Sequence, residues 1–126
     1  MIISIDFDGT VVRERWPEIG PPIPGAISAI RKLHAAGHKI IITSCRAGAP
    51  ELAMREWLSE HLPGCVDYIN ENDPERCLLY GGDCRKISAD VYIDDKNIFC
   101  EGISWKDILE EIQYRQWKIN RLSGRK

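Results

Sequence analysis

The chain opens with a short apolar run that ends in two carboxylates. Residues 2–5 (Ile-Ile-Ser-Ile) suit a strand that is buried on both faces, and Asp6 and Asp8 follow directly. In a parallel sheet, ligands collect at the carboxyl ends of the strands. Two carboxylates so close together repel each other unless a cation or a proton lies between them. The segment therefore predicts a divalent metal ion with oxygen ligands, and Gly9 lets the backbone turn sharply beside it.

Strand-type and helix-type patterns alternate along the rest of the chain. The expected strands are 2–5, 39–43, 65–69 and 89–93, with a short edge strand at 98–103. Helical patterns run between Pro24 and Gly37, over 50–62, and from Ser104 onward, where Ser104 and Asp107 have the spacing of a capping box. Residues 70–86 are polar and give no pattern. This alternation predicts an α/β fold with a parallel sheet covered by helices.

Length and composition indicate one domain over residues 1–126. Hydrophobic residues at 44% and charged residues at 29% are typical of a globular protein. A net charge of -2 gives no reason to expect nucleic acid or an anionic membrane as partner. No apolar run approaches the ~20 residues that span a bilayer. Met1 leads straight into the first strand, so we expect no signal peptide.

The cysteines indicate a reducing compartment. The five cysteines form no Cys-x-x-Cys pair, and their odd number and irregular spacing favour free thiols in a cytoplasmic protein: Cys45, Cys65, Cys77, Cys84 and Cys100. Cys45 lies near a strand end, where a catalytic thiol is conceivable. We interpret it instead as a small, semi-buried side chain.

Two segments have open interpretations. Residues 11–24 are too rich in proline and glycine for a helix, and they form either a flap-like loop over the site or a plain connector. Residues 115–126 are basic, with Arg115, Lys118, Arg121, Arg125 and Lys126. We expect them to be a solvated helix end rather than a contact with phosphate or a partner.

Three predicted strands end in polar groups that a parallel sheet would bring together. The groups are Asp6 and Asp8, then Thr43 and Ser44, then Asp94 and Asp95, and Lys86 lies just before the last of these strands. An acid cluster that binds a cation, a hydroxyl group and a lysine together suit phosphoryl transfer. The cation and the lysine offset negative charge, and the hydroxyl group positions an oxygen atom.

These segments resemble, in order, the four motifs of the haloacid dehalogenase-like hydrolase superfamily. The matching stretches are Asp-Phe-Asp-Gly-Thr at 6–10, the apolar strand that ends at Thr43, Lys86 with Arg85 beside it, and Val91 to Asp95. The resemblance implies a doubly wound, Rossmann-like, three-layer sandwich. It implies that Asp6 is the phosphorylated nucleophile and that Asp8 acts as general acid and then base. Phosphate would contact Thr43, Ser44 and Lys86, and Mg²⁺ would be held by Asp6, Asp8, Asp94 and Asp95.

The resemblance also implies an open site. The stretches on either side of Thr43 are too short for a full cap domain, so the chain is similar to capless phosphatases of the superfamily that act on a small phosphorylated substrate. Expected substrate contacts are Arg13, Arg15, Trp16 and Arg46. A nucleotide or polynucleotide end phosphatase is an alternative. A receiver-like phospho-acceptor or a non-catalytic binding domain are alternatives from other classes.

Overall fold

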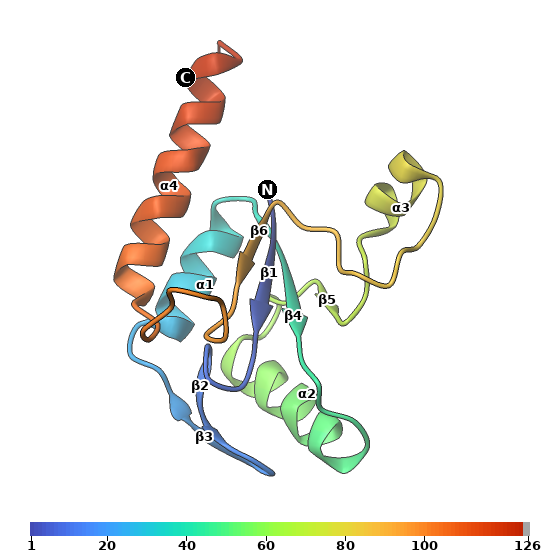
Figure 1. The fold of residues 1–126 in the computed structure, drawn as a ribbon, viewed down its shortest axis with the longest axis vertical. Coiled ribbons are helices and arrows are strands. Elements are labelled where there is room, and N and C mark those ends of the chain that lie inside the picture. The colour runs from blue at the N-terminus through green and yellow to red at the C-terminus, as the bar shows by residue number, and fades with distance from the viewer. Residues whose placement is uncertain (125–126) are drawn as a thin grey trace.

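Four parallel strands form the centre of the molecule (Figure 1). The computed structural model describes residues 1–124. Within it, β1 (Ile2–Asp6) lies between β4 (Lys39–Thr43) and β6 (Val91–Ile93), and β5 (Tyr68–Ile69) pairs with β4 at one edge. All three pairings are parallel, which confirms the α/β class and the parallel sheet.

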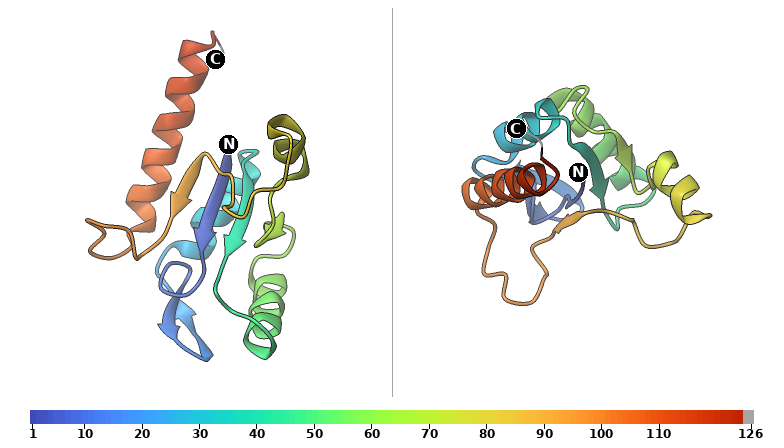
Figure 2. Two further views of the ribbon diagram at one scale, coloured as in Figure 1. Left: turned by 45° about the vertical axis from the view of Figure 1, so that its right-hand side comes forward. Right: turned by 90° about the horizontal axis from the view of Figure 1, so that it is seen from above.

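Three helices cover one face of this sheet (Figure 2). They are α1 (Ala26–Ala35), α2 (Ala49–His61) and α4 (Trp105–Leu122). Alternate side chains of a strand point to the same face, so every second residue of β1 and of β4 points toward these helices. These strand residues pack with residues of all three helices in a single core. It includes Ile3, Ile5, Ile40 and Ile42 from the strands and Ile30, Met54 and Ile112 from the helices.

The opposite face of the sheet is covered by residues 70–90. Ile41 and Ser4 point to this face and are buried. Lys39, which shares that face, donates from Nζ to Asp73 Oδ1 at 2.9 Å, and Asp73 is buried at the start of α3 (Pro74–Tyr80). Asp90 closes the segment by accepting a hydrogen bond from the backbone N–H of Ile2 at 2.8 Å.

The connections differ from the predicted ones in three places. Residues 11–24 contain an antiparallel hairpin of β2 (Val12–Arg15) and β3 (Glu18–Pro22), because proline keeps its carbonyl acceptor and is tolerated in edge strands. Helix α3 forms in the stretch that showed no pattern. The edge strand expected at 98–103 was wrong, since Phe99 and Gly102 adopt φ values of 67° and 122°, which an extended strand does not have.

The C-terminal basic segment is largely helical. Helix α4 begins at the expected cap, where the backbone N–H of Asp107 donates to Ser104 Oγ at 3.4 Å, and it continues to Leu122. Arg115 on this helix pairs with Glu111, and Arg121 stacks on the Trp117 ring. The predicted basic positions 125 and 126 lie outside the described residues. Within residues 1–124, no helix is long and apolar enough to cross a membrane.

Candidate metal centre and its cleft

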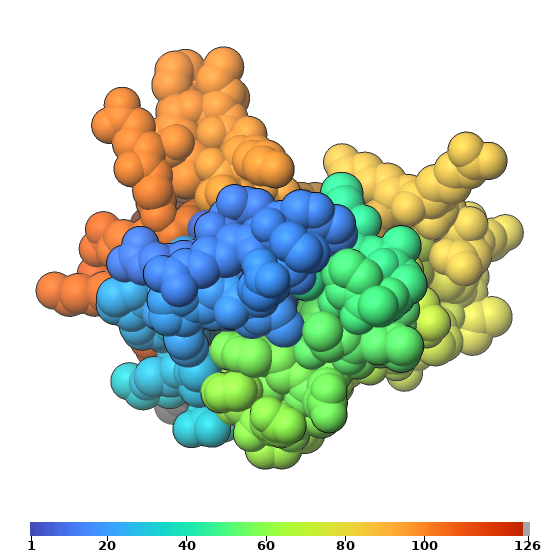
Figure 3. Space-filling view, turned by 90° about the horizontal axis from the view of Figure 1, so that it is seen from below, coloured from blue at the N-terminus to red at the C-terminus, as the bar shows by residue number. Residues whose placement is uncertain are grey.

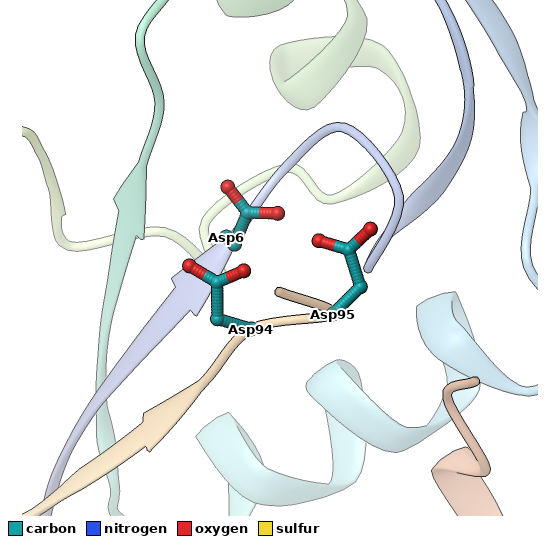
Figure 4. Close-up of side chains that lie close together, drawn as sticks. All are labelled: Asp6, Asp94 and Asp95. Atoms are coloured by element: carbon teal, nitrogen blue, oxygen red, sulfur yellow. The ribbon is translucent and has the colours of Figure 1, made fainter. Parts of the chain in front are cut away.

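Three carboxylates meet at the carboxyl end of the sheet (Figure 4). Asp6 is the last residue of β1, and Asp94 and Asp95 directly follow its neighbour β6. One oxygen atom of each lies within 4.8 Å of the others. Carboxylate oxygens at this spacing are the ligand type that hard divalent cations prefer.

Burial and mutual repulsion destabilise the negative charges of these three carboxylates. Burial is the main cause that raises the pKa of Asp6 from its ordinary value to about 7, and the negative charge of Asp94 adds to it. The Oδ1 atom of Asp95 is buried and has no hydrogen-bond partner within residues 1–124. Since buried polar atoms are rarely left unpaired, these three carboxylates have the oxygen atoms and the spacing to hold a hard divalent cation.

Thr10 connects the two acidic segments. Its Oγ1 donates to Asp6 Oδ2 at 3.1 Å and accepts from the backbone N–H of Asp95 at 3.1 Å. Its carbonyl oxygen accepts from Trp105 Nε1, at the start of α4, at 2.8 Å. Thr10 is fully buried. The turn after β1 is therefore fixed both to the segment after β6 and to the helical layer.

Gly9 is required by the approach of Asp95. A Cβ atom at Gly9 would lie 2.2 Å from Asp95 Oδ2, and the φ of Gly9 is +89°. Gly37 has a similar φ of +94° but nothing within 4 Å of such an atom. Backbone conformation favours glycine at both positions, but only at Gly9 does a side chain collide with the acidic group.

Asp8 lies outside the carboxylate cluster because its side chain is bound to Arg46. Arg46 donates from Nε to Asp8 Oδ2 at 2.7 Å and from Nη2 to Asp8 Oδ1 at 2.8 Å. Its other N–H groups donate to the carbonyl oxygens of Pro17, Glu18 and Pro50 at 3.1, 2.9 and 3.3 Å. These bonds use all five guanidinium donors.

This geometry bears on two of the predicted site roles. The Asp8 carboxylate is not among the three that converge as possible metal ligands. The Arg46 side chain is only 1% exposed and has no spare donor for a substrate. Its hydrogen bond with Asp8 raises the pKa of Arg46. It joins Asp8, the hairpin turn and the start of α2, and so acts as a positioning residue.

A cleft of about 310 Å³ opens beside Asp6. It is lined by Asp6, Asp8, Glu14, Trp16, Ser44, Cys45, Arg46 and Lys96. Seen from this end, the hairpin residues in blue lie against the green residues at the start of α2, while the orange 94–104 segment and the yellow α3 region project at two sides (Figure 3). Cys45 is exposed here, so its expected semi-burial was wrong.

The hairpin contributes one set of alternate side chains to the cleft. Glu14 and Trp16 line it, whereas Arg13 and Arg15, which alternate with them, do not. Both arginines are exposed. Of the expected contacts on this segment, the structure brings only Trp16 to the cleft. Sequence reasoning missed Glu14, although the period of two from Trp16 is a signal for it.

The end of β4 supplies the hydroxyl groups. Thr43 pairs with Asp6 in register, so the two side chains share a face. Ser44 Oγ accepts from the backbone N–H of Arg46 at 3.0 Å. The backbone of Ser44 is bound to the Asn70 amide in both directions, at 2.9 and 3.0 Å. Asn70 therefore fixes the position of the strand end.

Two lysines are near this end of the sheet. Lys86 is exposed, and its Nζ lies 5.0 Å from the centre of the Tyr92 ring. Tyr92 precedes Asp94 by two residues, so the two side chains point to the same face of the sheet. Two residues are separated by about 7 Å along a strand. Lys86 does not line the cleft, but Lys96 does. Sequence reasoning missed Lys96, although it directly follows the acidic pair.

Comparisons with known proteins show a similarity in structure and sequence to a solved protein. No model of a protein family matches the chain, and no curated protein matches it. Among solved structures, it is similar to a conserved protein from Bacteroides thetaiotaomicron, with 35% sequence identity and a TM-score of 0.75. The match covers 91% of this chain and 91% of that one.

Replacing Asp6 by asparagine should stabilise the metal-free protein more at pH 8 than at pH 5. Because the pKa of Asp6 rises from 3.8 to about 7 on folding, the folded state holds a proton that the unfolded chain releases within that range. Stability therefore falls as pH rises through this window, and the asparagine removes that dependence. Thermal unfolding with a chelator at both pH values measures it.

The matched control for this measurement is Glu60→Gln, which neutralises an exposed carboxylate on α2. It should change the melting temperature by similar small amounts at the two pH values. Equal stabilisation by Asp6→Asn at pH 5 and pH 8 would contradict the raised pKa.

Proposed function

The chain belongs to one family with the conserved Bacteroides thetaiotaomicron protein, and we propose that it is a Mg²⁺-dependent phosphatase of the haloacid dehalogenase-like type. In this proposal it hydrolyses phosphoric monoesters through an aspartyl-phosphate on Asp6. The observation that carries the proposal is the convergence of Asp6, Asp94 and Asp95 beside an open cleft. The parallel sheet with layers on both faces is compatible with the doubly wound, three-layer fold of that superfamily.

The metal assignment rests on the acidic group. Asp6, Asp94 and Asp95 would hold the ion, and the buried, unpaired Oδ1 of Asp95 supports this set. A bound Mg²⁺ would offset the negative charge of the carboxylates and of an entering phosphate group.

Asp6 has the position of a nucleophile. It lines the cleft, and Thr10 Oγ1 holds its Oδ2 in one orientation. In the proposed first step, the other oxygen attacks phosphorus and the bond from phosphorus to the ester oxygen breaks. The departing oxygen takes up a proton, which yields the alcohol and an acyl phosphate on Asp6. Water then cleaves the acyl phosphate and restores the carboxylate.

Asp8 is the proposed acid–base group, and its pairing with Arg46 affects the two steps differently. Both of its oxygens accept hydrogen bonds from Arg46, which fixes the orientation of the side chain that would remove a proton from water in the second step. To donate a proton in the first step, Asp8 must give up one of these bonds. Arg46 therefore affects proton transfer by Asp8 through its two hydrogen bonds to that side chain, without contacting the substrate.

The proposed substrate is a small phosphorylated molecule. The two-stranded hairpin of β2 and β3 forms one wall of the cleft. Thr43 shares a face of the sheet with Asp6, where it can contact a phosphate oxygen. Lys86 is proposed as the phosphate-binding lysine, since it lies on the face that carries Asp6 and Asp94 and is held there by contact with the Tyr92 ring. A cytoplasmic location is part of this proposal.

A short exposure to an aryl phosphate with Mg²⁺ should distinguish the two aspartates. Hydrolysis should vanish with excess chelator. Asp6→Asn should form no covalent phosphate, because an amide is a poor nucleophile. Asp8→Asn should slow turnover by about 10²–10⁴-fold and should accumulate phosphate on Asp6, because an activated leaving group needs no proton but the water does. Mass spectrometry detects the added phosphate, which hydroxylamine should remove.

Asp107→Asn on α4 is the control, since Asp107 is exposed and does not line the cleft. It should behave as the unmodified protein. Activity that persists in excess chelator, or a label that maps to Cys45 or a histidine, would show that the assignment is wrong.

A second comparison separates the lysines. Lys86→Met should lower kcat/KM by about 10²-fold, because a cation that meets the developing phosphate charge is lost. Lys96→Met should lower it by less than about 10-fold, since Lys96 lines the cleft as an exposed side chain whose charge water screens. Steady-state kinetics on one ester measures both. If Lys96→Met causes the larger loss, the phosphate lysine is Lys96.

A further inference from the structure

Trp16 is a large apolar side chain at the wall of the cleft. It follows β2 at the hairpin turn and lines the same cleft as Asp6. The residue is 55% exposed. An indole ring that remains half exposed beside a polar cleft leaves apolar area available for a ligand.

The inner face of this ring is already fixed. The Arg46 guanidinium carbon lies 5.3 Å from the centre of the Trp16 ring. Arg46 itself is held by its bonds to Asp8 and to three carbonyl oxygens, so it cannot shift without breaking them. The Trp16 backbone N–H also donates to Glu14 Oε1 at 3.3 Å. The contact with the fixed Arg46 therefore favours one placement of the indole before a ligand binds, which lowers the entropy cost of stacking on it.

We propose that the exposed part of Trp16 is a stacking platform for the leaving group, and that the site takes phosphate monoesters of flat aromatic groups, nucleoside monophosphates in particular. This rests on the proposed function, because it assumes that the phosphate lies at Asp6. Aromatic side chains stack on every nucleobase but offer much less to an aliphatic alcohol.

The surroundings of Trp16 restrict the class further. Glu14 lines the cleft beside it and provides an acceptor for an exocyclic amino or hydroxyl group. The cleft of about 310 Å³ lies at the small end of ligand sites, which suits one monoester and not a long polymer segment.

The test measures binding and needs no turnover. All variants carry Asp6→Asn, which blocks the proposed nucleophile and lowers the negative charge of the acidic cluster, and calorimetry without added metal compares AMP with ribose 5-phosphate, the same molecule without its base. AMP should bind about 10-fold more tightly. Trp16→Leu should reduce that preference to less than about 2-fold, whereas Trp16→Phe, which keeps a ring, should retain most of it.

Trp117→Leu is the matched control, since Trp117 on α4 is 53% exposed and lies away from the cleft lining. It should leave the preference unchanged. Equal binding of the two ligands, absence of AMP binding, or an unchanged preference in Trp16→Leu would each overturn the proposal.

Hydrolysis by the protein with Asp6 intact separates this inference from the proposed function. If wild type and Trp16→Leu hydrolyse AMP with the same kcat/KM, and ribose 5-phosphate likewise, the result supports the phosphatase assignment and contradicts the stacking platform. A base-dependent binding preference without any phosphoenzyme supports the platform and contradicts the phosphatase.

Discussion

The repulsion among three carboxylates is the constraint on which the rest of this end of the molecule depends. Asp6, Asp94 and Asp95 are brought together by the pairing of two neighbouring strands, and burial there raises the pKa of Asp6 to about 7. A fold tolerates such a group only where neighbouring hydrogen bonds and a cation or proton offset the charge. Thr10 supplies hydrogen bonds to both sides of the group, and Gly9 leaves the space that Asp95 occupies. The negative charge of these three carboxylates therefore accounts for the glycine at position 9, for the hydrogen bonds of Thr10 and for the proposed cation site.

Arg46 has the corresponding role on the other side of the cleft. A single buried guanidinium binds Asp8, the hairpin turn and the start of α2, and its face lies against the ring of Trp16. Removal of one partner from such a buried pair typically costs about 3–5 kcal/mol of stability, because the remaining charge is uncompensated. The hairpin is thus attached to the site through side-chain chemistry, and the proposed acid–base group and the proposed stacking platform depend on the same residue.

The sequence predicted the features that follow from strand periodicity. The buried run at 39–43 is β4 with the expected bounds, and the order of the strands brings Asp6 next to Asp94 and Asp95. It did not predict the partner of Asp8, because the contact between Asp8 and Arg46 joins residues distant in sequence. Nor did it predict helix α3, since that helix has no buried residue and hence no apolar stripe. Glu14 and Lys96 were missed because their place beside the cleft depends on the path of the hairpin and of the segment after β6, which hydrophobic patterns do not specify.

The central claim is that Asp6, Asp94 and Asp95 form a divalent cation site. The most direct test is titration of the protein with Mn²⁺, followed by the paramagnetic resonance signal of the free ion. We predict one bound Mn²⁺ per chain, displaced by Mg²⁺. Most of this binding should be lost in Asp94→Asn and Asp95→Asn and retained in Asp107→Asn, because only the first two remove a charged oxygen ligand from the cluster. Mn²⁺ that remains free in the presence of the protein, or that binds the Asp94 and Asp95 variants with unchanged affinity, would contradict the claim.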